Sequence, residues 1–209
     1  MKNQIENYGN TYSSKAVFKR SSIALFLCFI IILGFFSCHK EPFPFRRLGN
    51  PSAFTLTGPD GQAYHYKPDS GKVRLVFFGY TQCPDYCPAT MSKLKKVYAK
   101  LSLPKDELPE TIFISVDSDR DTPEILDKYL KSFEIPAIGL TGDKATLEEI
   151  ARDFKTFFFV EKKGNDTVVD HATFLYLIDP EGTIRYSFRN QDSADFIYDG
   201  IRSLYHEMN

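Results

Sequence analysis

The sequence is organised around the stretch Phe77-Phe78-Gly79-Tyr80-Thr81-Gln82-Cys83-Pro84-Asp85-Tyr86-Cys87-Pro88. The apolar run from Val73 to Phe78 predicts a buried strand, and the glycine after it predicts a turn. A proline follows each cysteine, and proline is favoured in the first turn of a helix. We therefore expect a helix from about Pro84 to Leu101. Both cysteines then lie at a helix N-terminus, where the helix dipole favours the thiolate over the thiol.

The spacing of Cys83 and Cys87 leaves several interpretations open. Residues four apart lie on one helical face, so both sulfurs can reach one disulfide or one metal ion. A purely structural disulfide is the simplest alternative, but a bridge that closes so short a loop constrains the unfolded chain little. A strand-turn-helix junction is also where α/β folds place reactive groups. The position therefore favours a chemical role over a structural bridge.

Residues 1–38 are predicted to be a targeting or anchoring segment outside the fold. Basic residues precede an uninterrupted apolar run from Ile23 to Phe36, as in a secretory signal. Ser37-Cys38 resembles a bacterial lipobox, which makes Cys38 the expected lipidation site of a lipoprotein. An uncleaved anchor is the main alternative, because the charge-free span Ser21 to Cys38 is about as long as the shortest spanning helices. Cleavage and release is the third. The first two hold an exported domain at the membrane, facing the extracytoplasmic (periplasmic) side.

Four cysteines occur in the chain, and two of them belong to the N-terminal segment. Cys28 lies inside the apolar run and is expected to be inert, while Cys38 is the expected lipid site. Cys83 and Cys87 are then the only cysteines of the folded domain, in a compartment where disulfides can persist. The whole chain has net charge −1 and its first 37 residues carry +3, which leaves −4 for the remainder. Nucleic-acid binding, which needs a basic face, is not indicated.

The remaining pattern predicts a linker at residues 39–52 and one domain at residues 53–209. The linker has alternating prolines and no periodicity, as expected of a tether. Asp60-Gly61 predicts an N-terminal β-hairpin. Two βα units, an inserted hairpin, a second hairpin and a closing helix follow. This order predicts the α/β class, with a thioredoxin-like three-layer fold in which helices flank a central mixed β-sheet.

A two-sulfur site needs a third group, and His171 is the only histidine between Cys87 and the last helix. It precedes a strand near the centre of the predicted sheet, in a loop that could approach the cysteine turn. Two thiolates and one imidazole suit Cu(I), or Cu(II) with a further ligand. A structural zinc site would need a fourth protein ligand. Asp170 is expected to orient the imidazole from outside the ligand set.

Other polar or sulfur-bearing candidates are interpreted as structural. Met91 lies on the apolar stripe of the predicted helix, so we expect a core residue rather than a thioether ligand. His65 alternates with tyrosines in a strand, and His39 lies in the linker, so both are expected at the surface. The acids of residues 117–121 lack the spacing of a Ca²⁺ loop. We expect a polar loop with capping acids there.

Three motifs in this order resemble the Sco/SenC family of copper-binding, thioredoxin-like proteins of cytochrome c oxidase assembly. They are Phe78-Gly79-Tyr80-Thr81-x-Cys83-Pro84-Asp85-x-Cys87-Pro88, then Ser115-Val116-Asp117 with Arg120-Asp121-Thr122-Pro123, and finally Asp170-His171 ahead of Tyr176-Leu177-Ile178-Asp179-Pro180-Glu181-Gly182. The resemblance covers Phe54 to the C-terminus. It implies that copper is bound by Cys83, Cys87 and His171. Ser118-Asp119 departs from the Pro-Glu that is common in the family.

The resemblance implies a copper metallochaperone rather than a conventional enzyme. Such a protein delivers copper to the dinuclear copper site of cytochrome c oxidase subunit II, or keeps the thiols of that site reduced; another copper or thiol protein is the alternative partner. The same two thiols can also close to a Cys83–Cys87 disulfide and release the metal. The competing hypothesis is a membrane-tethered thiol–disulfide oxidoreductase of thioredoxin type, in which Cys83 attacks and Cys87 resolves. A peroxidase is a weaker third hypothesis.

Overall fold

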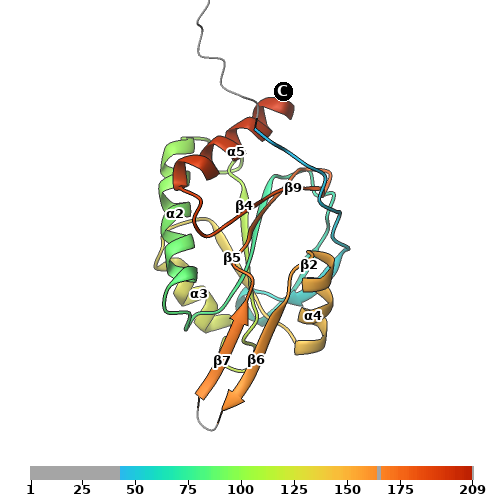
Figure 1. The fold of residues 1–209 in the computed structure, drawn as a ribbon, viewed down its shortest axis with the longest axis vertical. Coiled ribbons are helices and arrows are strands. Elements are labelled where there is room, and N and C mark those ends of the chain that lie inside the picture. The colour runs from blue at the N-terminus through green and yellow to red at the C-terminus, as the bar shows by residue number, and fades with distance from the viewer. Residues whose placement is uncertain (1–42, 164–165, 209) are drawn as a thin grey trace, which may run out of the picture. The chain divides into compact units, whose positions relative to one another are not determined.

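The computed structural model describes residues 43–163 and 166–208 (Figure 1). The predicted leader lies outside this range, and so do Cys28, Cys38 and His39. The elements, in chain order, are β1 (Phe54–Thr57), the 3₁₀ turn η1 (Pro59–Gly61), β2 (Ala63–Tyr66), β3 (Arg74–Gly79), α2 (Tyr86–Leu101), β4 (Glu110–Ser115), α3 (Pro123–Lys131), β5 (Ala137–Leu140), α4 (Lys144–Asp153), β6 (Phe158–Lys163), β7 (Asp166–His171), β8 (Leu175–Ile178), β9 (Ile184–Phe188) and α5 (Ala194–Met208).

A five-stranded sheet in the order β5-β4-β3-β8-β9 forms the centre of the domain. β3, β4 and β5 run parallel, whereas β8 is antiparallel to β3 and β9 is antiparallel to β8. Every residue of β3 is buried, including Arg74, and burial on both faces explains why Leu75 to Phe78 are all apolar. The mixed sheet, with helices on both faces, is the thioredoxin-like arrangement that the sequence predicts.

Alternate residues of β3 supply the two halves of the core. Leu75 and Phe77 pack on one face with residues of α2, α3 and α5, while Val76 and Phe78 pack on the other face with residues of α4 and of the β1–β2 hairpin. Period-two alternation produces this division, because successive side chains of a strand point to opposite faces. The end of β3 is therefore packed on both faces of the sheet, and this packing fixes the position of the turn that follows.

Residues 43–50 belong to the folded domain, although the sequence pattern indicates a free linker. The backbone N–H groups of Arg46 and Leu48 donate to carbonyls of Arg185 and Ile184 at 2.9 Å. The ring of Phe43 lies 4.9 Å from that of Tyr186. Alternating prolines suit an extended strand-like segment as well as a tether, and here the segment follows the edge of the sheet.

We expect a chain that begins at Pro51 to be less stable than one that begins at Phe43, by about 3 kcal/mol. The shorter chain loses the aromatic packing of Phe43 and Phe45 together with the backbone hydrogen bonds, and deletion of a packed phenylalanine side chain alone costs about this much. Urea unfolding of the two chains measures the difference. Equal unfolding midpoints would show that residues 43–50 contribute nothing.

The hairpin of β6 and β7 forms a two-stranded sheet of its own and projects from the domain (Figure 1). Phe158 and Val169 pack against the core, while Phe157 and Phe159 are 66% and 60% exposed. The sequence predicts this hairpin, but the structure extends its second strand to His171. Across the residues that the structure describes, no helix has both the length and the apolarity to span a membrane.

Candidate metal centre

The structure brings Cys83, Cys87 and His171 together. One potential ligand atom from each residue, two sulfurs and one imidazole nitrogen, lies within 4.8 Å of the others. The Cys87 Sγ atom is 4.0 Å from His171 Nε2. Both cysteines are free thiols. Among the described residues, this is the one group of three or more His, Cys, Asp or Glu side chains close enough to share a metal ion.

The two cysteines come from the turn after β3 and from the first turn of α2. Cys83 precedes the helix, and its sulfur lies 3.5 Å from the backbone N–H of Cys87. Both side chains are buried, with 7% of Cys83 and none of Cys87 exposed. The expected thiolate is wrong for Cys87, because burial raises the pKa of its thiol well above the usual range. Desolvation outweighs the helix dipole here.

His171 is the last residue of β7 rather than part of a loop. Its Nδ1 atom is 3.2 Å from the carbonyl oxygen of Ala172. A carbonyl can only accept a hydrogen bond, so Nδ1 carries the proton and Nε2 presents a lone pair to the sulfurs. Burial lowers the pKa of His171, which keeps the imidazole neutral near pH 7. The tautomer and the charge state both suit a metal ligand.

Two aromatic rings hold the imidazole in place. The ring of Tyr80 lies 5.7 Å from that of His171 and the ring of Phe77 lies 6.3 Å from it, both in edge-on contact. Asp170, which we expected to orient the imidazole, is exposed and pairs with Phe159 across the hairpin. His171 Nδ1 donates its hydrogen bond instead to the backbone carbonyl of Ala172.

Asp121 anchors the cysteine turn to the neighbouring strand. Its carboxylate accepts hydrogen bonds from the Thr81 backbone N–H at 2.9 Å, from the Thr81 hydroxyl at 2.5 Å and from the Ser115 hydroxyl at 2.7 Å. Asp121 is fully buried. The sequence showed an acidic loop, but it did not show which acid points inward or that Thr81 is its partner.

The rest of this loop contacts both parts of the site. Arg120 binds the carboxylate of Asp117 and donates to Gln82 Oε1 at 3.0 Å, beside the cysteines. Asp119 forms an ion pair of 2.7 Å with Lys162 on β6. The carboxylates of residues 117–121 thus serve as anchors for the cysteine turn and the hairpin.

The residues interpreted as structural occupy structural positions. Met91 is fully buried in the core beside α5. His65 is an exposed strand residue, and its Nδ1 atom is 2.9 Å from the Thr55 hydroxyl. Neither belongs to the cluster of Cys83, Cys87 and His171.

The donor set fits a soft, low-coordinate metal ion. Thiolate and imidazole are the ligands that Cu(I) prefers, and the three described donors match a three-coordinate site. A buried Cys87 thiol loses its proton readily only when a cation replaces it, so metal binding and proton release are coupled here. The buried site therefore favours the Cys87 thiolate with a bound soft cation over the same thiolate without one.

We expect Gly79→Ala to disturb the site directly. A Cβ atom at this position would lie 2.9 Å from Cys87 Sγ, 2.8 Å from the Phe77 ring and 2.9 Å from the Phe113 ring. Overpacking of this kind costs about 1–3 kcal/mol. Urea unfolding and Cu(I) titration should therefore both show a loss.

The matched control is Gly139→Ala on β5, where a Cβ atom would lie 2.8 Å from Leu126 Cβ. That variant should lose similar stability and keep its copper affinity once folded. Equal copper affinities in the two variants would contradict a role for Gly79 in the packing of Cys87.

The fold and the site define a class: a thioredoxin-like domain that carries a buried pair of free cysteines and a facing histidine. A model of one protein family, SCO1/SenC, matches residues 48–206. The chain belongs to this family. The matched range begins inside the segment 43–50 that packs on the sheet, and it includes all three clustered residues.

Relatives and solved structures agree with this assignment. The SCO2-like protein of Rickettsia prowazekii is 35% identical over 152 residues, which covers 71% of this chain and 72% of that protein. Three further curated relatives are covered over only 45–63% of their length. The crystal structure of Arabidopsis thaliana ScoI with copper bound has a TM-score of 0.69 and 30% identity, covering 76% of this chain and 99% of that one. A SCO1/SenC family lipoprotein from Bacillus anthracis has a TM-score of 0.63 and 25% identity, covering 79% and 98%.

Proposed function

We propose that this protein is a copper metallochaperone that binds one Cu(I) ion through Cys83, Cys87 and His171. The observation that supports it is the convergence of two thiol sulfurs and one unprotonated imidazole nitrogen within 4.8 Å. Membership of the SCO1/SenC family, and the copper named in the Arabidopsis structure, favour copper over another soft ion.

Metal transfer follows from the coordination number. Three ligands hold Cu(I) while leaving room for a sulfur or imidazole of a partner to enter as a fourth, so copper can pass by ligand exchange without a free ion. The partner that the family favours is subunit II of cytochrome c oxidase or another copper or thiol protein. A disulfide of the partner could accept two electrons from the Cys83 and Cys87 thiolates and take up two protons as it becomes two thiols, which would leave a Cys83–Cys87 disulfide here and free the metal.

The proposed setting is the outer face of a membrane. Residues 1–38 would supply a leader, with Cys38 as the lipidated residue, and the domain would face the extracytoplasmic side. The lipoprotein named among the similar structures supports this arrangement. Mass spectrometry of the N-terminal peptide from the mature protein would decide between a lipidated Cys38 and an uncleaved anchor.

Cu(I) titration of the full chain, in competition with a chelator of known affinity, tests the ligand set. We expect one tightly bound ion per chain, and His171→Ala should weaken binding by at least about tenfold, because even the loss of a residue that only orients a ligand costs that much. The control is His65→Ala, which removes an exposed histidine. Unchanged affinity in His171→Ala would remove His171 from the ligand set.

A thiol–disulfide oxidoreductase is the second candidate. The closeness of two free sulfurs favours it, and the slightly exposed Cys83 would attack while the buried Cys87 resolves. This function predicts that the copper-free protein turns over a disulfide substrate. Cys83→Ser should abolish the turnover, and His171→Ala should leave it unchanged. Absence of turnover in copper-free protein would exclude it.

A further inference from the structure

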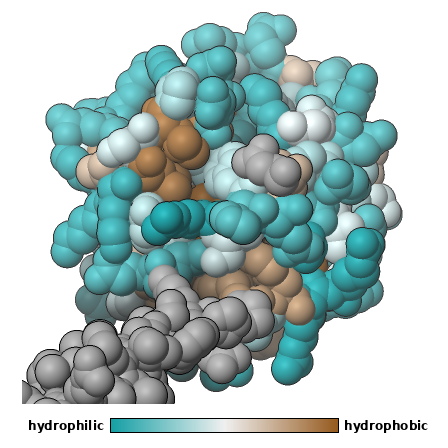
Figure 2. Space-filling model, turned by 90° about the horizontal axis from the view of Figure 1, so that it is seen from above, coloured by the Kyte–Doolittle hydropathy of each residue, from teal (hydrophilic) through white to brown (hydrophobic). Residues whose placement is uncertain are grey.

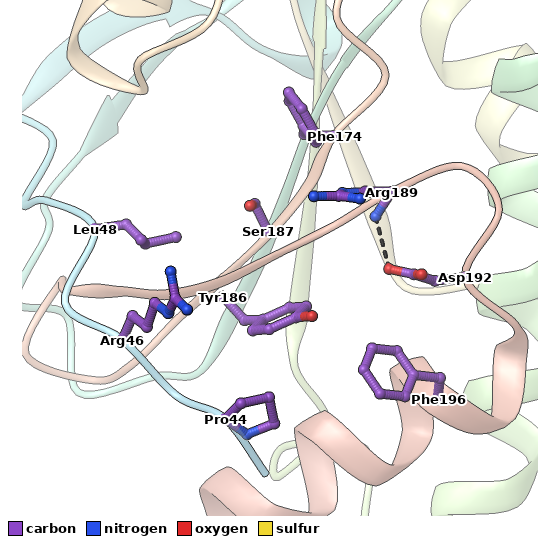
Figure 3. Close-up of a pocket in the computed structure, with 9 residues that line it drawn as sticks. All are labelled: Pro44, Arg46, Leu48, Phe174, Tyr186, Ser187, Arg189, Asp192 and Phe196. Atoms are coloured by element: carbon purple, nitrogen blue, oxygen red, sulfur yellow. Dashed lines mark hydrogen bonds between the residues drawn. The ribbon is translucent and has the colours of Figure 1, made fainter.

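A pocket lies away from the metal centre, between the segment 43–50, β9 and the start of α5. Its volume is about 460 Å³. Its lining includes two arginines, one serine and three aromatic residues, which are Arg46, Arg189, Ser187, Phe174, Tyr186 and Phe196. Figure 3 shows the two arginine side chains approaching from opposite sides, with Ser187 between them.

The pocket carries a net positive charge, because two arginines and one carboxylate line it. Neither Arg46 nor Arg189 has an ion-pair partner among the described residues, whereas the neighbouring Arg185 pairs with both Asp179 and Glu207. One carboxylate, from Asp192, also lines the pocket, but it accepts a hydrogen bond of 2.8 Å from the backbone N–H of Arg189. Two guanidinium groups and a hydroxyl therefore offer donors to an anion, and guanidinium geometry matches phosphate oxygens.

Aromatic rings form the apolar part of the pocket wall. The rings of Tyr186 and Phe196 lie 5.9 Å apart, and Phe43 packs against both. A small hydrophilic anion would use the arginines and leave these rings in contact with water. A ligand that carries a phosphate next to an apolar portion would use both parts of the pocket.

The position of the pocket indicates where such a ligand would come from. The pocket adjoins the segment at which the described chain begins, and this end of the domain is mostly hydrophilic with separate apolar patches (Figure 2). The predicted anchor ends at Cys38, five residues before Phe43, and five residues of extended chain span at most about 18 Å. If residues 1–38 anchor the chain as proposed, so short a connection would keep the domain near the lipid headgroups.

We propose that the pocket of Arg46 and Arg189 binds the phosphate group of an anionic phospholipid, with the aromatic rings against the glycerol and the first acyl carbons. Binding there would hold this end of the domain at the bilayer. Figure 1 shows the hairpin that carries His171 projecting at the other end. The metal centre would then face away from the membrane surface, toward soluble domains of its partners.

Native mass spectrometry of the full chain, released from neutral detergent micelles in the presence of phosphatidylglycerol, tests this proposal. We expect one retained lipid per chain, and weaker retention of phosphatidylcholine. Arg46→Gln and Arg189→Gln should each weaken retention by about tenfold, the worth of one charge-assisted hydrogen bond. The matched control is Arg47→Gln, which removes an adjacent exposed arginine that does not line the pocket.

The outcomes separate cleanly. Loss of retention in the two pocket variants alone supports the site. Equal loss in Arg47→Gln would show unspecific attraction to charge, and no retained lipid in the wild type would equally overturn the proposal. Displacement of the lipid by an equal concentration of glycerol phosphate would show that the pocket takes a soluble phosphate instead. Copper affinity is unaffected in every case, so failure here is distinct from failure of the copper assignment.

Discussion

Cys87→Ser is expected to lower the affinity for Cu(I) by more than about 100-fold. The serine oxygen is a hard donor that Cu(I) binds poorly, and mutation of residues that only orient ligands already costs 10–100-fold. Two donors would remain, and a two-donor site leaves the metal open to chelators. Cu(I) titration against a competing chelator measures the loss, and Cys83→Ser should behave in the same way.

The control for the cysteine variants is Met91→Leu, which changes a sulfur-bearing side chain one turn away on the same helix face. Its copper affinity should match that of the wild type, because Met91 is buried in the core and lies outside the cluster. Tight one-to-one copper binding that survives in Cys87→Ser would refute the ligand assignment. A loss of affinity in Met91→Leu would point to a thioether ligand instead.

Asp121→Ala is expected to destabilise the domain by roughly 3 kcal/mol and to weaken copper binding as well. The substitution leaves the Thr81 N–H, the Thr81 hydroxyl and the Ser115 hydroxyl without their shared acceptor, and buried unsatisfied donors cost about 1–3 kcal/mol each. Thr81 lies two residues before Cys83, so release of this turn also displaces the first ligand. Urea unfolding and Cu(I) titration measure the two effects separately.

Asp119→Ala on the same loop is the comparison for Asp121→Ala. Asp119 is exposed and its ion pair is with a surface lysine, so its loss should change stability little. Similar unfolding midpoints for the two variants would mean that the buried network around Asp121 does not hold the turn.

Most of the fold could be predicted from local patterns. β3 and β4 were visible as apolar runs, the β1–β2 hairpin followed from Asp60-Gly61, and the order of elements gave a mixed sheet. The segment 43–50 could not be assigned in this way. Its prolines indicate an extended chain, but whether an extended chain is free or packed depends on partners such as Tyr186, which are distant in sequence.

The three clustered residues could be predicted from the sequence, whereas the burial and hydrogen bonds around them could not. Spacing identified the cysteines, and elimination pointed to His171, because no other histidine lies between Cys87 and the last helix. The pKa of Cys87 was not predictable, since the helix dipole and burial act in opposite directions and only the structure shows that burial is complete. Asp121 was hidden among neighbouring acids that look alike in sequence.

The loop at residues 117–121 contacts the cysteine turn through buried hydrogen bonds and the hairpin through a surface ion pair. These two kinds of contact respond differently to ionic strength. The pair of Asp119 with Lys162 lies at the surface, where physiological salt screens charges over about 8 Å. The buried hydrogen bonds of Asp121 are not accessible to salt. Raising the salt concentration therefore weakens the Asp119–Lys162 pair and leaves the cysteine turn in place, while the base of the hairpin, where Phe158 pairs with His171, stays packed on the core.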